Sequence, residues 1–126
     1  IKRTLPVLLE VNISGESTKY GFPAWDETRW DELIRDFEEI SQLSSLAIHG
    51  LMTMPPYYVN PEMVRPYFAK THRLQELLTR FLPKTAWSEL SMGTSNDFIV
   101  AIEEGATYVR IGEAILGKRE VGKTPS

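Results

Sequence analysis

Two glycine turns in the C-terminal part of the sequence are candidates for binding a phosphate group through backbone N–H groups. Gly93 stands shortly before Ser95, and Gly112 stands shortly after Arg110 and directly before Glu113. Each glycine ends a short β-prone run and precedes a segment with helical spacing. If the two runs are neighbouring parallel strands, the N–H groups at both helix starts converge on one point, which attracts phosphate. Alternatively, the two glycines only permit tight turns, because isolated glycines are weak signals.

The strands that would position these turns follow from the residues on either side of them. We expect a buried strand end at Glu89–Met92 and a second strand over Thr107–Ile111, which is rich in β-prone residues. Gly112 breaks the second strand, and Glu113–Leu116 then predicts another short helical turn. The predicted order is therefore strand, glycine turn, helix, strand, glycine turn, helix.

The first of these helices has recognisable signals at both ends. Ser95 or Asn96 is suited to be the N-cap, with Asp97 in the first turn. Apolar residues then recur at helical spacing from Phe98, and Gly105 stands where a left-handed residue ends a helix. We expect this helix to be short and to end at Gly105.

Upstream, apolar runs alternate with amphipathic segments. The pattern predicts strands over Leu5–Ile13 and Leu46–Met54, one helix from about Asp26 to Leu43, and another that starts at Asn60 and stops before Pro83. Strands that alternate with helices form parallel sheets. The sequence therefore predicts an α/β protein of about four βα units with parallel strands.

The length of the chain suggests part of a barrel. A complete (β/α)8 TIM barrel needs roughly 250 residues, and the sequence has 126. We expect the C-terminal half of such a barrel over residues 1–117, followed by a polar tail over residues 118–126. A half barrel leaves strand edges and an apolar inner face uncovered. We therefore expect a partner, either a missing N-terminal half barrel or a second copy of the chain.

Composition and charge exclude several classes of protein. Hydrophobic residues make up 42% and charged residues 25%, which is typical of a globular domain. A net charge of -3 gives no basic patch, so we expect no nucleic-acid binding. The absence of cysteine excludes disulfides and thiol catalysis. With no signal peptide and no apolar run of membrane-spanning length, we expect a cytoplasmic protein.

Few residues are candidates for other chemistry. The two histidines, His49 and His72, are well apart, so we expect neither a metal site nor a Ser–His pair, and we assign no catalytic residue. Asn12 stands at the C-terminal end of the first predicted strand, where its amide could face a ligand.

Several segments resemble a known family. The sequence is similar to the C-terminal signature of the YggS/PROSC family of pyridoxal-phosphate homeostasis proteins, in LSMGTSNDF (residues 90–98), AIEEGAT (101–107) and VRIG (109–112). The resemblance continues upstream in LLEVNIS (8–14), KYGF (19–22) and GLMTMPP (50–56). It covers nearly the whole chain in the right order.

The resemblance implies a cofactor and a set of binding residues. Similar proteins hold pyridoxal 5′-phosphate (PLP) as a Schiff base in a barrel related to the N-terminal domain of bacterial alanine racemase. By analogy, Ser95 and the backbone N–H groups of Gly112 and Glu113 bind the phosphate, Arg110 faces the pyridine nitrogen, and Met92 lines the pocket. An arginine beside the nitrogen keeps it unprotonated, which suits a carrier better than carbanion chemistry. Considered without the resemblance, Arg110 could instead form a structural ion pair.

The chain also departs from the family pattern. Glu113 stands where family members usually have threonine, so a hydroxyl contact is lost and a carboxylate is placed near the phosphate, which lowers affinity unless Glu113 turns outward. The family's Schiff-base lysine lies on the first barrel strand, upstream of Ile1. None of the chain's own lysines is a convincing substitute, because they lie in predicted loops, helices or tails: Lys2, Lys19, Lys70, Lys84, Lys118 and Lys123.

Three functions remain open at this stage. The first is PLP binding and intracellular PLP homeostasis, in which this chain supplies the phosphate-binding half of the site and no catalysis of its own. The second is a racemase-type PLP enzyme, which needs a β-rich second domain with a catalytic tyrosine. The third is a barrel enzyme acting on a small phosphorylated metabolite, which needs paired acid and base residues, and only Glu113 offers itself.

Overall fold

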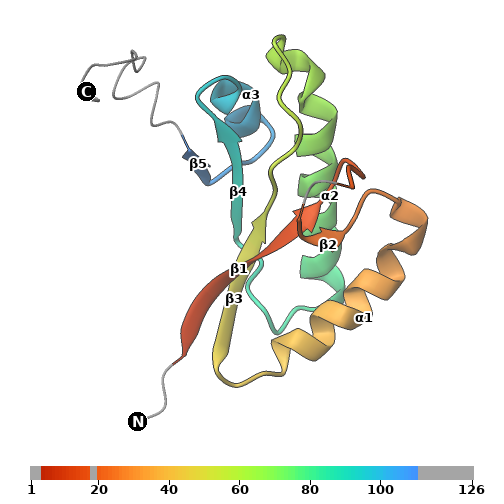
Figure 1. Ribbon diagram of the computed structural model, residues 1–126. Coiled ribbons are helices and arrows are strands. Elements are labelled where there is room, and N and C mark those ends of the chain that lie inside the picture. Colours follow the sequence, from red (N-terminus) through yellow and green to blue (C-terminus); the bar gives the residue numbers. More distant parts are fainter. Residues whose placement is uncertain (1–3, 18–19, 111–126) are drawn as a thin grey trace.

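The computed structural model of the chain describes residues 4–17 and 20–110. Five strands alternate with helices along the sequence (Figure 1). In chain order the elements are β1 (Leu5–Asn12), β2 (Phe22–Pro23), the 3-10 helix η1 (Glu27–Arg29), α1 (Trp30–Ser41), β3 (Leu46–Met52), the 3-10 helix η2 (Pro61–Met63), α2 (Arg65–Phe81), β4 (Glu89–Thr94), α3 (Phe98–Glu103) and β5 (Tyr108–Arg110).

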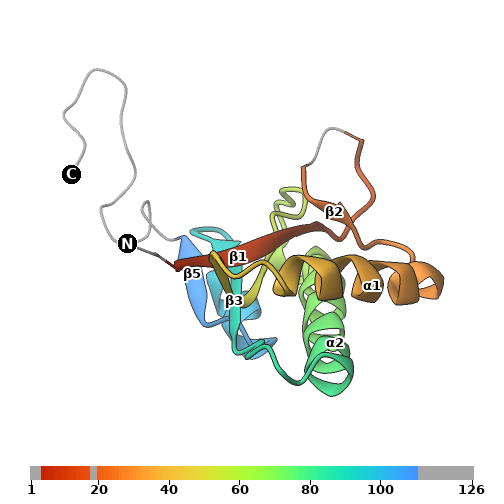
Figure 2. The same cartoon turned by 90° about the horizontal axis from the view of Figure 1, so that it is seen from below.

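The strands form one sheet in the order β2-β1-β3-β4-β5, and each neighbouring pair is parallel. The α1 and α2 helices lie on the same side of this sheet (Figures 1 and 2). The predicted α/β fold with parallel strands and intervening helices is therefore confirmed. Among the helices that the structure describes, none has the length and apolar character required to span a bilayer.

The core lies between the sheet and its helices. On α1, Trp30, Leu33 and Phe37 are buried because their helical spacing places them on one face of the helix. Phe37 packs edge to face against Phe22 and is stacked on Trp87, with ring centroids 5.1 and 5.9 Å apart. Burying one such aromatic side chain stabilises the fold by about 1.5–3 kcal/mol.

The short strand β2 (Phe22–Pro23) is absent from the sequence-based prediction. Its two residues pair with the end of β1, in the register Val11 to Phe22 and Asn12 to Pro23. Two residues are too few for a periodic pattern to appear in the sequence. The pairing instead depends on a tertiary contact, because Phe22 packs against the core residue Phe37.

The start of α3 also differs from the prediction. Asp97 is the N-cap, rather than Ser95 or Asn96, and the helix begins at Phe98. The physical reason is a local turn, in which Asp97 Oδ1 accepts a hydrogen bond of 2.7 Å from the Thr94 backbone N–H. This bond fixes the residues between them before the helix starts. The predicted helix end is confirmed, because Gly105 has a φ of +106°, in the left-handed region.

Candidate functional site

The carboxyl ends of β3, β4 and β5 meet at one edge of the sheet, because the three strands are parallel neighbours. The register aligns Met52 with Ser91, Ser91 with Tyr108, and Thr94 with Arg110. Residues that leave these strands at the same edge are therefore close in space. In open and closed parallel α/β folds this edge is where ligands bind.

Arg110, the last described residue, lies at this edge with an exposed side chain. Its Nη1 donates a hydrogen bond of 2.8 Å to Ser91 Oγ, and its Nη2 donates one of 3.3 Å to the Thr53 carbonyl oxygen. Within residues 4–17 and 20–110, no carboxylate forms an ion pair with Arg110. The guanidinium group is thus oriented by two neutral oxygens that leave its positive charge available.

Ser91 and Thr53 are site residues that sequence reasoning missed. Both are buried, with exposed fractions of 8% and 1%. Thr53 donates through Oγ1 to the Val11 carbonyl at 2.9 Å and through its backbone N–H to the Ser91 carbonyl at 3.0 Å. It therefore connects β1 and β4 just beyond the end of β3. The available signal was a threonine between two methionines at the end of an apolar run, which pattern analysis treats as core.

Ser95 lies in the loop between β4 and α3, and its side chain is half-buried. The residues around it are firmly held. Asp97, which is buried, accepts from Thr94 as described, and Asn96 Nδ2 donates to the Tyr58 carbonyl at 2.8 Å. The loop that carries Ser95, the predicted phosphate-binding residue, is therefore held by hydrogen bonds on both sides of it.

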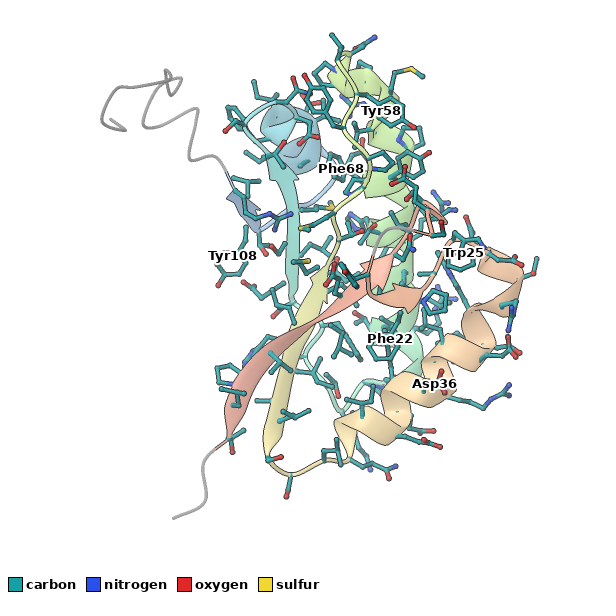
Figure 3. The ribbon with its side chains drawn as sticks, in the orientation of Figure 1. Phe22, Trp25, Asp36, Tyr58, Phe68 and Tyr108 are labelled. Atoms are coloured by element: carbon teal, nitrogen blue, oxygen red, sulfur yellow. The ribbon has the colours of Figure 1, made fainter. Side chains whose placement is uncertain are left out.

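The segment around Tyr58, which accepts the hydrogen bond from Asn96, packs on α2. The rings of Tyr58 and Tyr67 are stacked with centroids 6.3 Å apart, and their hydroxyl groups are 3.4 Å apart. The hydrogen bond with Tyr58 raises the pKa of the Tyr67 hydroxyl above its ordinary value. Figure 3 shows Tyr58 near the same end of the molecule as α3 and the end of β4.

An arginine fixes α3 against α2. Arg65 forms ion pairs with Glu62, Glu103 and Glu104 at 2.7 to 2.8 Å. Hydrogen bonds to these carboxylates, with that to Glu62 the strongest, raise the pKa of Arg65, and the same partner lowers the pKa of Glu62. His72 adds a bond of 2.8 Å between its Nδ1 and the Glu104 carbonyl. The end of α3 is therefore held from α2, which steadies the adjoining site.

Of the remaining site candidates, Met92 and Asn12 lie among the described residues. Met92 is fully buried in the core, and strand alternation directs it to the face of β4 opposite to Ser91. It is therefore not brought together with Arg110. Gly112 and Glu113 lie outside the described residues. Asn12 closes its own turn, because Oδ1 accepts from the Gly15 N–H and Nδ2 donates to the Glu16 carbonyl.

A cavity of about 420 Å³ opens on the sheet away from the Arg110 edge. It is lined by residues from the early parts of the strands and from the segment before β4: Pro6, Val7, Leu8, His49, Ser88, Glu89 and Tyr108. Figure 3 shows Tyr108 on the side of the sheet away from α1 and α2. This face of the sheet therefore has no helix packed against it among the described elements.

Comparison with known proteins gives consistent matches over nearly the whole chain. Residues 1–120 match the family described as alanine racemase, N-terminal domain. The pyridoxal phosphate homeostasis protein of Aquifex aeolicus is 48% identical over 114 residues, which are 90% of this chain and 47% of the relative. The human protein of the same name is 37% identical over 125 residues, covering 97% of this chain and 43% of the relative.

Solved structures show the same likeness. PipY of Synechococcus elongatus PCC7942 without PLP matches with a TM-score of 0.79 and 29% identity, over 91% of this chain and 51% of PipY. PipY with PLP bound matches with a TM-score of 0.75 and 29% identity, over 91% of this chain and 50% of PipY. The predicted resemblance to pyridoxal-phosphate homeostasis proteins is therefore confirmed. The chain spans about half the length of the curated relatives it matches.

Proposed function

The chain belongs to the alanine racemase N-terminal domain family, and on that premise we propose that it binds PLP and takes part in PLP homeostasis. Support comes from the similar proteins named for this role and from the PLP-bound structure of PipY. Because the chain spans about half of those relatives, the proposal concerns one half of a divided site.

The observation that carries the proposal is the environment of Arg110. A guanidinium group at the ligand edge of a parallel sheet, held by neutral oxygens at 2.8 and 3.3 Å, keeps both its charge and further N–H donors for a ligand. PLP is anionic and carries a pyridine nitrogen that accepts a hydrogen bond when unprotonated. The arginine and the cofactor are therefore chemically complementary.

The phosphate is assigned to the loop after β4. Ser95 would donate its hydroxyl there, held in place by the bonds of Asn96 and Asp97. The backbone N–H groups of Gly112 and Glu113, which follow β5 in the sequence, would complete the phosphate site. The Glu113 carboxylate would weaken phosphate binding by repulsion unless it faces away.

When bound, PLP supplies an aldehyde that reacts with amines and a pyridine ring whose electron demand rises on protonation. A guanidinium beside the ring nitrogen disfavours that protonation, since two adjacent positive charges repel. This supports a carrier role over carbanion chemistry. The amine that attaches the aldehyde is expected from outside this chain. Lys70, for example, already donates to the Trp25 carbonyl at 2.7 Å.

We also propose that a further half barrel completes the site. The helix-free face of the sheet, with its cavity of about 420 Å³, offers a surface for such a partner. An N-terminal half barrel fits the difference in length between this chain and its relatives, of which it covers 47% and 43%, better than a second copy, which would duplicate the Arg110 edge.

Calorimetric titration of the chain with PLP tests the proposal. We expect saturable binding that Arg110→Ala weakens, while Arg29→Ala leaves it unchanged, because Arg29 is exposed on η1 and paired with Glu32. Borohydride treatment followed by intact mass should leave the chain unmodified unless a segment carrying the lysine is added. Absence of saturable binding, or equal binding by the Arg110→Ala variant, would refute the proposal.

A further inference from the structure

The two groups that hold Arg110 differ from ordinary ion-pair partners. Ser91 Oγ and the Thr53 carbonyl oxygen each accept one N–H, at 2.8 and 3.3 Å, and neither carries a charge. A guanidinium group has five N–H donors in a rigid plane. Two contacts on two different nitrogens fix the orientation of that plane, and within residues 4–17 and 20–110 its other donors have no hydrogen-bond partner.

Both acceptors belong to well-fixed residues. Thr53 is 1% exposed, and it is tied to β1 through its hydroxyl and to β4 through its backbone N–H. Ser91 is 8% exposed and lies within β4, in register with Met52 on one side and Tyr108 on the other. The exposed and flexible side chain of Arg110 is thus held by two rigid points on neighbouring strands.

From this arrangement we infer that Ser91 and Thr53 are positioning residues, which set the guanidinium plane of Arg110 toward the ring nitrogen of the ligand. This inference rests on the proposed function for the identity of the ligand. The orientation of Arg110 in the free chain does not depend on that function. Holding the side chain in advance removes the entropy loss that a long flexible arginine otherwise suffers on binding.

The inference predicts a specific dependence between variants. Ser91→Ala removes one hydrogen bond to a charged group and should weaken ligand binding by about tenfold. In an Arg110→Ala background the same substitution should have no further effect, because Ser91 acts through Arg110. Thr53→Val removes the bond to the Val11 carbonyl but keeps the Thr53 carbonyl that accepts from Arg110, so we expect a smaller loss of ligand affinity. Thr53→Ser keeps the hydroxyl group and should retain the affinity of the unaltered chain.

The test uses 4′-deoxypyridoxine 5′-phosphate, which lacks the aldehyde and therefore needs no lysine. Calorimetry gives affinities for the chain and its variants, and ultraviolet titration gives the pKa of the bound ring nitrogen, which Ser91→Ala should raise toward that of the free ligand. Separately, the NMR order parameter of the Arg110 Nε–Hε bond is measured without ligand, and Ser91→Ala should lower it. Ser44→Ala, at an exposed serine between α1 and β3, is the matched control and should change none of these values.

The outcomes separate the two proposals. An equal loss of affinity from Ser91→Ala with and without Arg110, or an unchanged Arg110 order parameter, overturns the positioning role. If the unaltered chain binds no ligand while Ser91→Ala still loosens Arg110, the proposed function fails, and only the orientation of Arg110 by Ser91 in the free chain is supported. Circular dichroism of each variant is the control that its fold matches that of the unaltered chain.

Discussion

The side-chain amide of Asn96 donates a hydrogen bond of 2.8 Å to the backbone carbonyl of Tyr58. This bond joins the loop after β4 to the segment after β3, although the two residues are far apart in sequence. Because Ser95 is the neighbour of Asn96, the bond also limits how Ser95, the predicted phosphate-binding residue, can move. The loops at the ligand edge therefore support one another.

This relationship gives a first prediction. Asn96→Asp keeps the size of the side chain but removes the N–H donor and places a carboxylate near a carbonyl oxygen. We expect a loss of about 1 kcal/mol in the free energy of unfolding and weaker PLP binding. Urea denaturation and calorimetry measure the two effects. Asn96→Gln keeps the amide and should lose less, and an unchanged affinity in Asn96→Asp would argue against a role for this bond in holding Ser95.

Gly93 provides a second prediction. Its φ is +108°, and a Cβ added there would lie 2.7 Å from the Ala101 Cβ. Gly93→Ala should therefore destabilise the chain by about 1–3 kcal/mol through backbone strain, with the steric clash added. The double variant Gly93→Ala with Ala101→Gly should recover the steric part only. Thermal unfolding followed by circular dichroism compares them, and a fully stable single variant would contradict the observed packing of β4 on α3.

A third prediction concerns pH and the joint between α2 and α3. Arg65 lowers the pKa of Glu62 below its usual value of 4.5. A depressed carboxyl pKa contributes stability that is fully present above pH 4.5 and is lost as the pH falls through the lower, folded-state value. The free energy of unfolding should decrease over that acidic range. Arg65→Met keeps the packing of the side-chain stem and should flatten this dependence.

Denaturant titrations at several pH values between neutral pH and strongly acidic conditions measure this effect. Arg29→Met is the matched control for losing an exposed ion pair, because Arg29 on η1 pairs with Glu32 on α1. An identical acid dependence in Arg65→Met and the unaltered chain would show that these ion pairs do not couple to folding.

The fourth prediction concerns the core. Phe37 is fully buried and packs against both Phe22 and Trp87. Phe37→Ala should cost about 3–5 kcal/mol, and β2 should lose its pairing because Phe22 loses its contact. Hydrogen exchange at the Phe22 amide and denaturant unfolding follow the two effects. Ile102→Ala, at an exposed position on α3, should change stability little.

Much of the fold could be predicted from the residues alone. The alternation of apolar runs with amphipathic segments determined the parallel α/β arrangement, because each pattern has one period that suits one element. Local chemistry also determined where several helices begin or end. Asn60 caps η2 through a bond of 3.0 Å from the Glu62 N–H, and Gly105 ends α3 in the left-handed region.

The candidate site was predicted only in part. Arg110 and Ser95 came from the family resemblance, and the structure gives both a fixed surrounding at the ligand edge. Ser91 and Thr53 were missed, because a buried serine or threonine in an apolar run looks like core until its hydrogen-bond partner is known. Met92, expected beside the ligand, is fully buried in the hydrophobic core, and its contact with the ligand stays a prediction.

By itself, the sequence determined the order of the longer strands and helices, since periodicity and capping act between residues close in the chain. Tertiary structure alone decided the pairing of β2 and the hydrogen bonds of Arg110 to Ser91 and Thr53, whereas the N-cap at Asp97 was settled by a local turn with Thr94. Each of these depends on contacts between segments that are distant in sequence or on the competition between neighbouring polar groups. No local pattern records such contacts, because strand register is set when the whole sheet assembles.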